Sequence, residues 1–435
     1  MKTNEKDTKQ RVVPALRFPE FSDMQEWEEI PMHQIGKTLT GLSGKNSSDF
    51  GYGNRYITYK QVYSDTVNDF DKCEKVFVNK SEKQNCVQQG DVLFTTSSET
   101  PDEVGISSVI LKPLPETIYL NSFCFILRPY DINNLYTQFA KHLFQSPIYR
   151  KRINKLAQGA IRFNLSKAQF INLSLPIAVS LKEQQKIADC LSSIDALIKA
   201  TENKIDELKT HKKGLMQQLF PAEGKMVPTL RFPEFQNAGE WKPYKLNDFG
   251  SFFRGLTYST ADVSNNNEGI GVLRSTNIQN NRLILDKDLV FVNKTCSSEQ
   301  RLQKGDIVIC MSNGSKTLVG KNAELDQDIS YDLTVGAFCS IFRPKNVFAK
   351  YLLQTDSYTK FVALAIGGGN INNLKNSDLE NFVQFAPTKP EEQKKIADCL
   401  SSVDDLIMAQ TNRLEAFKAH KKGLMQQLFP NIDEC

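Results

Sequence analysis

Two long segments of the chain carry apolar residues at spacings that alternate between four and three. One seam runs from Ile187 to Leu219 and the other from Ile396 to Leu428. A period of 3.5 residues kept over more than four heptads is typical of helices paired in a coiled coil. Pro221 and Pro430 follow the last seam positions and are expected to end both helices.

The two helical segments are copies of one another. Residues 183–221 align without a gap on residues 392–430, and 27 of the 39 positions are identical. A second duplication opens each half, where VPALRFPEF at 13–21 returns as VPTLRFPEF at 227–235. The sequence between these repeated ends diverges widely. Such a tandem repeat predicts one scaffold that presents two different surfaces.

Local signals refine the two helices. We expect capping boxes at Ser180 with Glu183 and at Thr388 with Glu391. Polar residues in the seam should fix register and partner choice; they are Thr201, Gln410, Lys212 and Lys421. Gly214 and Gly423 are expected to mark a bend or a close contact.

The order of the segments predicts how the helices pair. Each helix of roughly 38 residues would be about 57 Å long. The first helix leads from one variable region to the other, so an antiparallel pair needs no long return loop. We therefore predict two domains joined by an antiparallel intramolecular coiled coil, with a pseudo-twofold tandem repeat.

The variable regions read as mixed α/β domains. Strands are predicted at Tyr56–Lys60, Val76–Val78, Asp91–Thr96, Ser107–Leu111 and Phe123–Leu127, and again at Leu289–Val292, Asp306–Cys310 and Phe338–Phe342. A helix should begin at Ser146 and Pro147 and end near Gly159. The predicted boundaries are a polar tail at 1–12, a first domain at 13–181, a helix at 182–221, a second domain at 222–390, a second helix at 391–430 and a tail at 431–435.

Composition narrows the class of protein. No apolar run reaches the ~18 residues of a membrane helix, and the polar start lacks the apolar core of a signal peptide. The nine cysteines contain no CxxC pair, which argues against a disulfide framework and a zinc site. We therefore expect buried thiols, no metal and a reducing cytoplasm.

The net charge of +4 is weak evidence for nucleic acid, but its distribution is uneven. Residues 132–182 hold eight basic residues and no acidic one, and residues 333–377 hold five basic residues against Asp356 alone. Such a patch is expected where phosphates are neutralised, and its recurrence favours DNA. A solvated helical face would give the same pattern.

The chain resembles a known family, the specificity subunit of type I restriction–modification enzymes. The resemblance rests on a glycine–aspartate pair before a strand, Gly90–Phe94 and Gly305–Ile309, and on the run into each helix. That run leads from Asn164 through Pro176 to Ala188, and from Asn373 through Pro387 to Ala397. It covers residues 13–430.

The resemblance implies two target-recognition domains, each reading one half of a split DNA site, with the coiled coil setting the spacer. It also implies partners: double-stranded DNA, two adenine-methylating subunits bound through the helices, and a translocating endonuclease subunit. The family has no fixed pattern of base-reading residues.

The residues themselves show no catalytic equipment. The chain lacks the Asn/Asp-Pro-Pro-aromatic tetrapeptide of an amino-methyltransferase and has only four histidines. We therefore predict a non-catalytic subunit without a cofactor. Two other interpretations stay open, a coiled-coil interaction scaffold without DNA and an enzyme with an unrecognised site.

Base-reading candidates should be polar and carried by loops. In the first domain they are Lys45, Asn46, Arg55, Tyr56, Thr95, Thr96, Ser97, Arg162 and Asn164. In the second domain they are Arg254, Tyr258, Arg274, Asn277, Ser312, Asn313, Ser315, Lys316, Asn370 and Asn373. Ordinary surface-loop positions would look the same.

Overall fold

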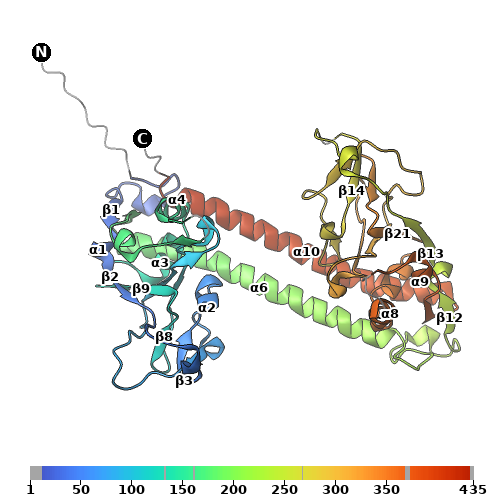
Figure 1. The fold of residues 1–435 in the computed structure, drawn as a ribbon, viewed down its shortest axis with the longest axis horizontal. Helices are drawn as coiled ribbons and strands as arrows, with labels where there is room; N and C mark the ends of the chain where they lie inside the picture. Colours follow the sequence, from blue (N-terminus) through green and yellow to red (C-terminus); the bar gives the residue numbers. More distant parts are fainter. Residues whose placement is uncertain (1–11, 132–133, 160–161, 267, 368–372, 432–435) are drawn as a thin grey trace, which may run out of the picture. The chain divides into compact units, whose positions relative to one another are not determined.

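The computed structural model describes residues 12–431 except 132–133, 160–161, 267 and 368–372. The chain divides into two units, one formed by residues 1–202 with 412–435 and the other by residues 203–411 (Figure 1). Helix α6 (Leu181–Leu219) starts in the first unit and ends in the second, and α10 (Pro390–Leu428) does the reverse. Each unit therefore contains the start of one long helix and the end of the other.

The helix segments within each unit run antiparallel. In the first unit Asp195 bonds to Lys421 at 2.6 Å and Glu202 lies 3.7 Å from Lys418, so rising numbers in one helix meet falling numbers in the other. In the second unit Lys212 meets Asp404 at 2.6 Å. Both seam lysines are thus paired with an aspartate from the facing helix. The antiparallel pairing expected from the order of the segments is confirmed in both units.

The first domain contains a four-stranded antiparallel sheet in the order β2-β9-β5-β7. Its strands are β2 (Gly36–Thr40), β9 (Cys124–Pro129), β5 (Val92–Thr95) and β7 (Ser107–Val109). A second sheet has the order β4-β3-β8, formed by β4 (Glu74–Val76), β3 (Phe50–Ile57) and β8 (Ile118–Leu120). Two-stranded pairs join β1 (Glu28–Pro31) to β11 (Ser174–Ile177) and β6 (Ser97–Ser98) to β10 (Phe163–Asn164).

The second domain repeats this order in a wider sheet, β13-β21-β18-β19-β16-β15. Its strands are β13 (Gly250–Arg254), β21 (Cys339–Pro344), β18 (Ile307–Cys310), β19 (Asn322–Glu324), β16 (Arg282–Leu283) and β15 (Ile278–Gln279). The smaller sheet, β17-β14-β20, uses β17 (Val290–Val292), β14 (Ile270–Leu273) and β20 (Leu333–Val335). Strand β12 (Lys242–Lys245) pairs with β22 (Val383–Ala386).

Short helices complete each domain. The first has α1 (Met32–Ile35), α2 (Tyr59–Tyr63), α3 (Thr137–Leu143), α4 (Pro147–Leu156) and α5 (Lys167–Phe170). The second has α7 (Phe348–Leu352), α8 (Asp356–Gly367) and α9 (Asn376–Glu380). The Ser146 hydroxyl accepts a bond from the Tyr149 amide, so the N-cap predicted for α4 is confirmed.

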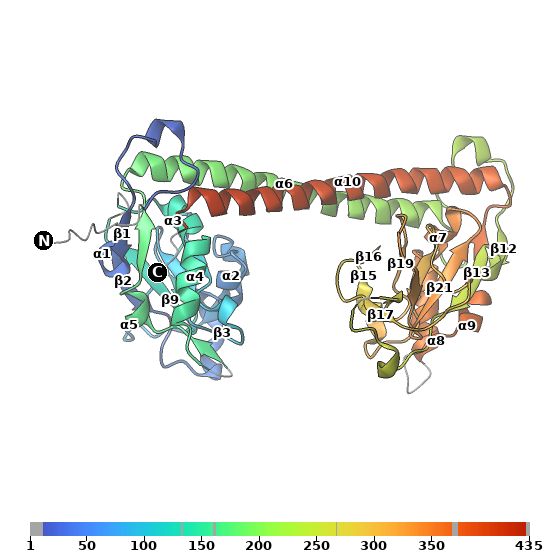
Figure 2. The same ribbon diagram turned by 90° about the horizontal axis from the view of Figure 1, so that it is seen from above.

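The core of each unit joins the domain to its own helix segments. In the first unit Trp27 packs edge-on against Phe139 and Phe429, beside Leu191 of α6. In the second unit Trp241 and Phe348 pack on Phe220, beside Leu400 of α10. In the view of Figure 2 each domain lies along one side of its own helix segments. The repeated ends of the sequence therefore build the same attachment twice.

Two local expectations were wrong. The strand predicted at Tyr56–Lys60 ends at Ile57, because Thr58 caps α2 by accepting a bond from the Gln61 amide. The two predicted capping boxes do not form. The Glu183 carboxylate binds Arg17 and Trp27 instead. In the second unit Glu392, the residue after Glu391, binds Arg231 and Trp241 in the same way.

The close contact expected at Gly214 and Gly423 is not found among the described residues. A Cβ atom built on either glycine would meet no described atom within 4 Å beyond its own helix and chain neighbours.

Candidate nucleic-acid interface

A buried ion pair fixes the central strands of each large sheet. Arg128, at the end of β9, donates to both carboxylate oxygens of Asp91 at 2.8 and 2.7 Å, and Arg343 does the same to Asp306. The pKa of each guanidinium is raised by its hydrogen bonds to the aspartate. Such bidentate pairs hold two strands in one register. The glycine–aspartate motif is therefore a framework element and not a ligand site.

Three segments meet at the opposite end of the central strands in the first domain. The Thr96 amide and hydroxyl donate to the Phe123 carbonyl at 2.9 and 2.8 Å, and the Leu165 amide donates to the Thr96 carbonyl at 2.8 Å. The Arg162 guanidinium lies 5.5 Å from the centre of the Phe123 ring. We call this meeting of residues 96–97, 121–123 and 162–165 the first junction.

The second domain builds the same junction with other residues. The Met311 amide donates to the Phe338 carbonyl at 2.8 Å, and the Leu374 amide donates to the Met311 carbonyl at 2.8 Å. Ser312 also pairs with Asn373 through a β-bridge. We call the meeting of residues 311–313, 336–338 and 373–374 the second junction. Its backbone bonds match those of the first junction, and Asn373 stands at the position of Asn164, whereas Met311 stands at the position of Thr96.

A neighbouring loop reaches the second junction. The Asn313 side-chain amide donates to the Ser275 hydroxyl at 3.2 Å, next to Arg274. The exposed Arg274 donates to the Asp288 carbonyl at 3.0 Å.

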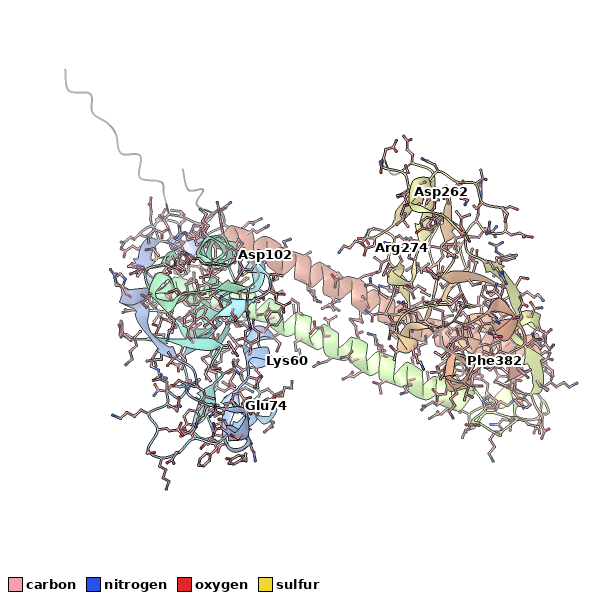
Figure 3. All side chains as sticks on the ribbon, in the orientation of Figure 1. Lys60, Glu74, Asp102, Asp262, Arg274 and Phe382 are labelled. Atoms are coloured by element: carbon pink, nitrogen blue, oxygen red, sulfur yellow. The ribbon has the colours of Figure 1, made fainter. Side chains whose placement is uncertain are left out.

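Figure 3 shows Arg274 and Asp262 in the yellow part of this domain and Phe382 beside α8. In the first unit it places Lys60 and Glu74 in the blue part and Asp102 near α4.

The structure sorts the predicted base readers by exposure. Eight are exposed: Asn46, Arg162, Asn164, Arg254, Arg274, Ser315, Lys316 and Asn373. Six are half-buried: Lys45, Arg55, Thr96, Tyr258, Ser312 and Asn313. Asn370 lies outside the described residues. The junctions bring together Thr96, Arg162 and Asn164 in the first domain and Ser312, Asn313 and Asn373 in the second.

Tyr56 and Asn277 are buried and have structural partners. The Tyr56 hydroxyl donates to Glu74 at 2.8 Å, and burial followed by this bond raises the pKa of the phenol. The Asn277 side chain accepts from the Arg274 amide and donates to two carbonyls, so both of its polar ends are used. Neither side chain is free to reach a base edge, and we withdraw both from the set.

Thr95 and Ser97 are also buried. The Thr95 hydroxyl donates to the Glu103 carbonyl and accepts from the Ile106 amide. The Ser97 carbonyl accepts the Tyr59 hydroxyl at 2.8 Å. These contacts hold the loop after β5 in place beneath the first junction. The two residues therefore position Thr96 instead of reading bases themselves.

Lys45 and Arg55 are engaged in ion pairs. Lys45 lies 2.6 Å from Glu82, and its hydrogen bond lowers the pKa of that carboxyl to about 2. Arg55 lies 3.1 Å from Glu116 and 3.9 Å from Asp71. Either cation would have to leave a carboxylate to contact DNA, which makes both weaker candidates than Arg274.

Much of the basic stretch also serves the fold. Lys141 lies between Asp65 and Asp195, at 3.1 and 3.5 Å. Arg152 pairs with Glu29 at 2.7 Å, and Arg150 donates to the backbone carbonyls of residues 102 and 104. The recurrence of positive charge in this part of the sequence therefore reflects internal pairs, and only exposed members such as Arg162 could meet phosphate.

Sequence reasoning missed Phe123 and Phe338. The two residues are 52% and 69% exposed, although each directly precedes a buried strand. The strand pattern in the sequence predicts both as the first residue of a strand. A signal existed, because a phenylalanine precedes a cysteine at the same place in both repeats, Phe123-Cys124 and Phe338-Cys339.

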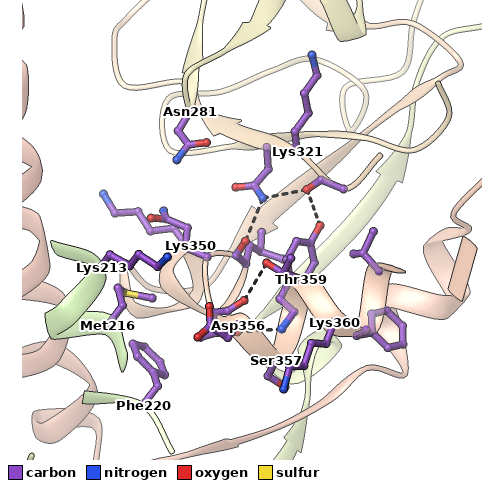
Figure 4. Close-up of a pocket in the computed structure, with 18 of the residues that line it drawn as sticks. Lys213, Met216, Phe220, Asn281, Lys321, Lys350, Asp356, Ser357, Thr359 and Lys360 are labelled. Carbon is purple, nitrogen blue, oxygen red and sulfur yellow. Dashed lines mark hydrogen bonds between the residues drawn. The ribbon is translucent and has the colours of Figure 1, made fainter. Parts of the chain in front are cut away.

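A large concavity of about 1730 Å³ lies in the second unit between the end of α6, α8 and the large sheet (Figure 4). It is lined by lysines such as Lys213, Lys321 and Lys350 and by apolar side chains such as Met216 and Phe220. Three of its six carboxylates form ion pairs: Glu324 with Lys350, Glu223 with Lys360 and Asp404 with Lys212. Carboxylates neutralised in this way are poorly suited to act as general bases.

Other kinds of site are limited in the part of the chain that the structure describes. Among these residues, no group of three or more His, Cys, Asp or Glu side chains could hold a metal ion. None of the described helices is both long and apolar enough to cross a membrane. The expectation of buried thiols holds for Cys124, Cys310 and Cys339, whereas the other five described cysteines are half-buried. Burial raises the pKa of the Cys124 thiol, and that of Cys339 to about 12, which makes both unreactive.

Comparison with known sequences identifies the repeat. The sequence model of the type I restriction modification DNA specificity domain matches residues 24–210 and again residues 238–416. The chain belongs to this family. The two matches of the specificity domain follow the two copies of the tandem repeat.

Individual relatives agree. The specificity subunit of the type I restriction enzyme EcoKI from Escherichia coli (strain K12) is 33% identical over 186 residues, 40% of this chain and 38% of that protein. The alignment thus spans about two fifths of the EcoKI subunit. The MjaVIII specificity subunit of Methanocaldococcus jannaschii is 23% identical over 431 residues, 95% of this chain and 93% of that protein.

Solved structures share the fold of this specificity-domain protein. The S subunit of the type I restriction–modification system from M. genitalium has a TM-score of 0.56 at 14% identity, over 97% of this chain and 100% of that one. A chain from a study of complex assembly and conformational transition in the type I R-M system has a TM-score of 0.51 at 15% identity, over 93% and 98%. The tandem α/β architecture predicted from the sequence is confirmed.

Proposed function

We propose that this chain is the DNA sequence-specificity subunit of a type I restriction–modification complex. Family membership supports this proposal, and one structural observation carries it. The two junctions use the same backbone hydrogen bonds and share an asparagine at one equivalent position, Asn164 and Asn373, but Met311 and Asn313 stand in the second where the first has Thr96 and Ser98. A shared frame with different side chains suits two domains that read two different half-sites.

In this proposal the target-recognition domains are residues 13–181 and 222–390, with helices at 182–221 and 391–430. Each domain reads one half of a bipartite duplex site through its junction and the adjoining loops. Exposed polar side chains on loops can form the bidentate bonds to base edges that distinguish base pairs in the major groove. Arg162, Arg274 and Lys316 are suited to guanine or phosphate, and Asn164 and Asn373 to adenine.

The remaining work belongs to partner subunits. We propose that two methyltransferase subunits dock on the helices and modify adenine, and that endonuclease and translocase subunits join this core. The chain itself contributes recognition and assembly and carries no catalytic residue or cofactor. Its place of action is then the cytoplasm, where chromosomal DNA and the partner subunits are available.

The direct test is a map of modified bases. The chain and its methyltransferase partner would be expressed in a host without adenine methylation, and the genome would be sequenced for N6-methyladenine. We expect methylation at one bipartite motif with a spacer of constant length. Methylation that persists when the chain is omitted, or no methylation with both subunits present, would overturn the proposal. Purified chain incubated with DNA and S-adenosylmethionine tests separately for an activity of its own.

A further inference from the structure

Two phenylalanines occupy equivalent exposed positions in domains that otherwise diverge. Phe123 precedes β9 and Phe338 precedes β21, and these strands are the counterparts of one another in the two large sheets. Both residues are more than half exposed. A single exposed apolar residue is ordinary. Two at the same place in the fold, each inside a junction of predicted base readers, form a pattern that needs a physical reason.

The backbone at each phenylalanine is held firmly. The Phe123 carbonyl accepts two bonds from Thr96, and the Phe123 amide donates to the Asn121 side chain at 2.9 Å. The Phe338 carbonyl accepts the amides of Met311 and Ser312 at 2.8 and 3.2 Å. The backbone that carries each ring is therefore fixed within its junction. A preorganised apolar group loses little conformational entropy when it is covered.

The surroundings of each ring are polar. Arg162 lies over the face of Phe123, and Thr96 and Asn164 belong to the same junction. In the second junction the Ser312 amide donates to the Phe338 carbonyl, and Ser312 pairs with Asn373 through a β-bridge. This setting differs from that of an apolar protein-docking patch, which would extend over several hydrophobic residues. It matches a surface that presents hydrogen-bonding groups around one apolar contact.

The chemistry of a phenyl ring limits the parts of a DNA duplex that it can contact. The ring has no group that can donate to a phosphate or balance its charge, so it cannot serve in backbone contacts. It can pack against a thymine methyl group in the major groove or enter between two base pairs. Both contacts depend on the bases.

We propose that Phe123 and Phe338 are specificity-determining residues, each packing its ring against the bases of the half-site read by its own domain. This inference rests on the proposed function and deepens it. Phe123 acts in one half-site and Phe338 in the other, and the polar members of each junction supply the hydrogen bonds around the ring.

The test compares Phe123→Ala and Phe338→Ala in the full chain assembled with its methyltransferase subunits. Each complex selects from a pool of duplexes with randomised half-sites, and the bound fraction is sequenced. We expect each variant to lose roughly tenfold or more discrimination at one or two positions of one half-site, with the other half unchanged. Phe123→Leu, which keeps an apolar contact, should retain most of the preference.

Matched controls come from the far ends of the same strands. Tyr130 follows β9 and is 64% exposed, and Val347 follows β21 and is 54% exposed. Tyr130→Ala and Val347→Ala remove equally exposed apolar groups outside the junctions and should leave both half-sites unchanged. If an alanine variant fails to fold, Phe123→Gln or Phe338→Gln keeps a longer side chain than alanine and replaces the aromatic ring by a polar amide.

The outcomes separate this inference from the proposed function. A loss of preference confined to one half-site supports the inference. An even loss of affinity across all sequences, an unchanged preference, or an effect equal to that of the controls would overturn it while the unmodified chain still selects a bipartite site. Absence of any sequence preference in the unmodified complex would overturn the proposed function together with this inference.

Discussion

Arg17 and Glu183 form a bidentate ion pair between residues 166 positions apart in the sequence, with both N–O distances at 2.8 Å. The side chains are 8% and 1% exposed, and the Trp27 indole donates to the same carboxylate at 3.0 Å. Arg231, Glu392 and Trp241 repeat the arrangement in the second unit. The duplicated opening motif therefore fastens each domain to the start of its own helix.

Removing the buried carboxylate should destabilise its own unit. Glu183→Gln leaves the Arg17 guanidinium buried without its counter-charge, and we expect a loss of about 3 kcal/mol in the free energy of unfolding. Glu392→Gln should cost a similar amount through Arg231. Urea unfolding followed by circular dichroism measures both changes.

Glu391→Gln is the matched control, since Glu391 is exposed at the start of the same helix. This variant should change stability by less than about 0.5 kcal/mol. A loss for Glu183→Gln no greater than that of the control would show that the ion pair does not anchor the domain.

His142 makes the first unit sensitive to acid. Its side chain is fully buried, with Nε2 3.2 Å from the Ser192 hydroxyl, and burial lowers its pKa to about 3. The unfolded chain takes up a proton near pH 6.5, whereas the folded chain does not until about pH 3. Stability from this group is thus complete above about pH 6.5 and is lost as the pH falls towards 3, by up to about 1.4 kcal/mol per unit.

The second repeat supplies the variant that tests this dependence. Tyr351 occupies the equivalent position and bonds to Ser401 and Asp404, the counterparts of Ser192 and Asp195. His142→Tyr should therefore fold and should reduce the fall in unfolding free energy between pH 6.5 and 4. The same slope in the variant and the unmodified chain would contradict the assignment. His33→Tyr, at an exposed position, is the control.

Arg274 and Arg55 should differ in their effect on DNA recognition. Arg274 is exposed beside the second junction, so Arg274→Ala should relax base preference in one half-site, at a cost of about 1–3 kcal/mol for the preferred base. Arg55 is held by Glu116, and Arg55→Ala should leave the preference intact. Selection from randomised duplexes at several salt concentrations measures both. An even loss for Arg274→Ala, with the salt slope lower by about one charge, would assign it to phosphate.

Helix length should set the spacer between the half-sites. Four residues inserted after Ala200 extend an uninterrupted helix by about 6 Å, close to two base pairs, and rotate the distal part of that helix by about 40°. We expect unchanged half-sites and a spacer longer by about one or two base pairs. The ion pair between Asp195 and Lys421 sets a register in which Ala416 lies opposite Ala200. A variant with a second four-residue insertion after Ala416 therefore lengthens both helices at the same level, so the two helices need not slip past one another.

The control places the same four residues after Gly224, in an exposed turn outside both helices. It should leave the spacer unchanged. Methylation maps of the three variants decide the matter, and full activity with an unaltered spacer in the helix variants would rule out a ruler.

The repeating features of the fold could be predicted from the sequence. The heptads predicted paired helices because a 3.5-residue period is a local pattern that tertiary contacts reinforce, and the order of the segments predicted that the pair is antiparallel. The strands β5, β9, β18 and β21 were found to within about two residues because each is a short apolar run next to a glycine or proline. Asn164 and Asn373 were predicted as base-reading candidates on loops, and the structure places both at the junctions.

Features that depend on distant partners could not be predicted. Glu183 reads locally as a capping residue, but its carboxylate is bound by Arg17 from the start of the chain. Lys141 and Arg152 read as a phosphate-binding patch, but Asp65 and Glu29 neutralise them. Phe123 reads as a core strand residue, and its exposure follows from a turn fixed by Thr96.

The central claim is that each domain reads one half of the DNA site independently. Replacing residues 22–179 by the corresponding segment of another family member keeps Arg17 and Glu183, and the incoming segment should retain a tryptophan at the position of Trp27. The decisive measurement is the map of methylated adenines in cells that express this chimera with its methyltransferase partner. We predict a bipartite site in which one half is new and the other half and the spacer are unchanged. A change in both halves, or in neither, would contradict the claim.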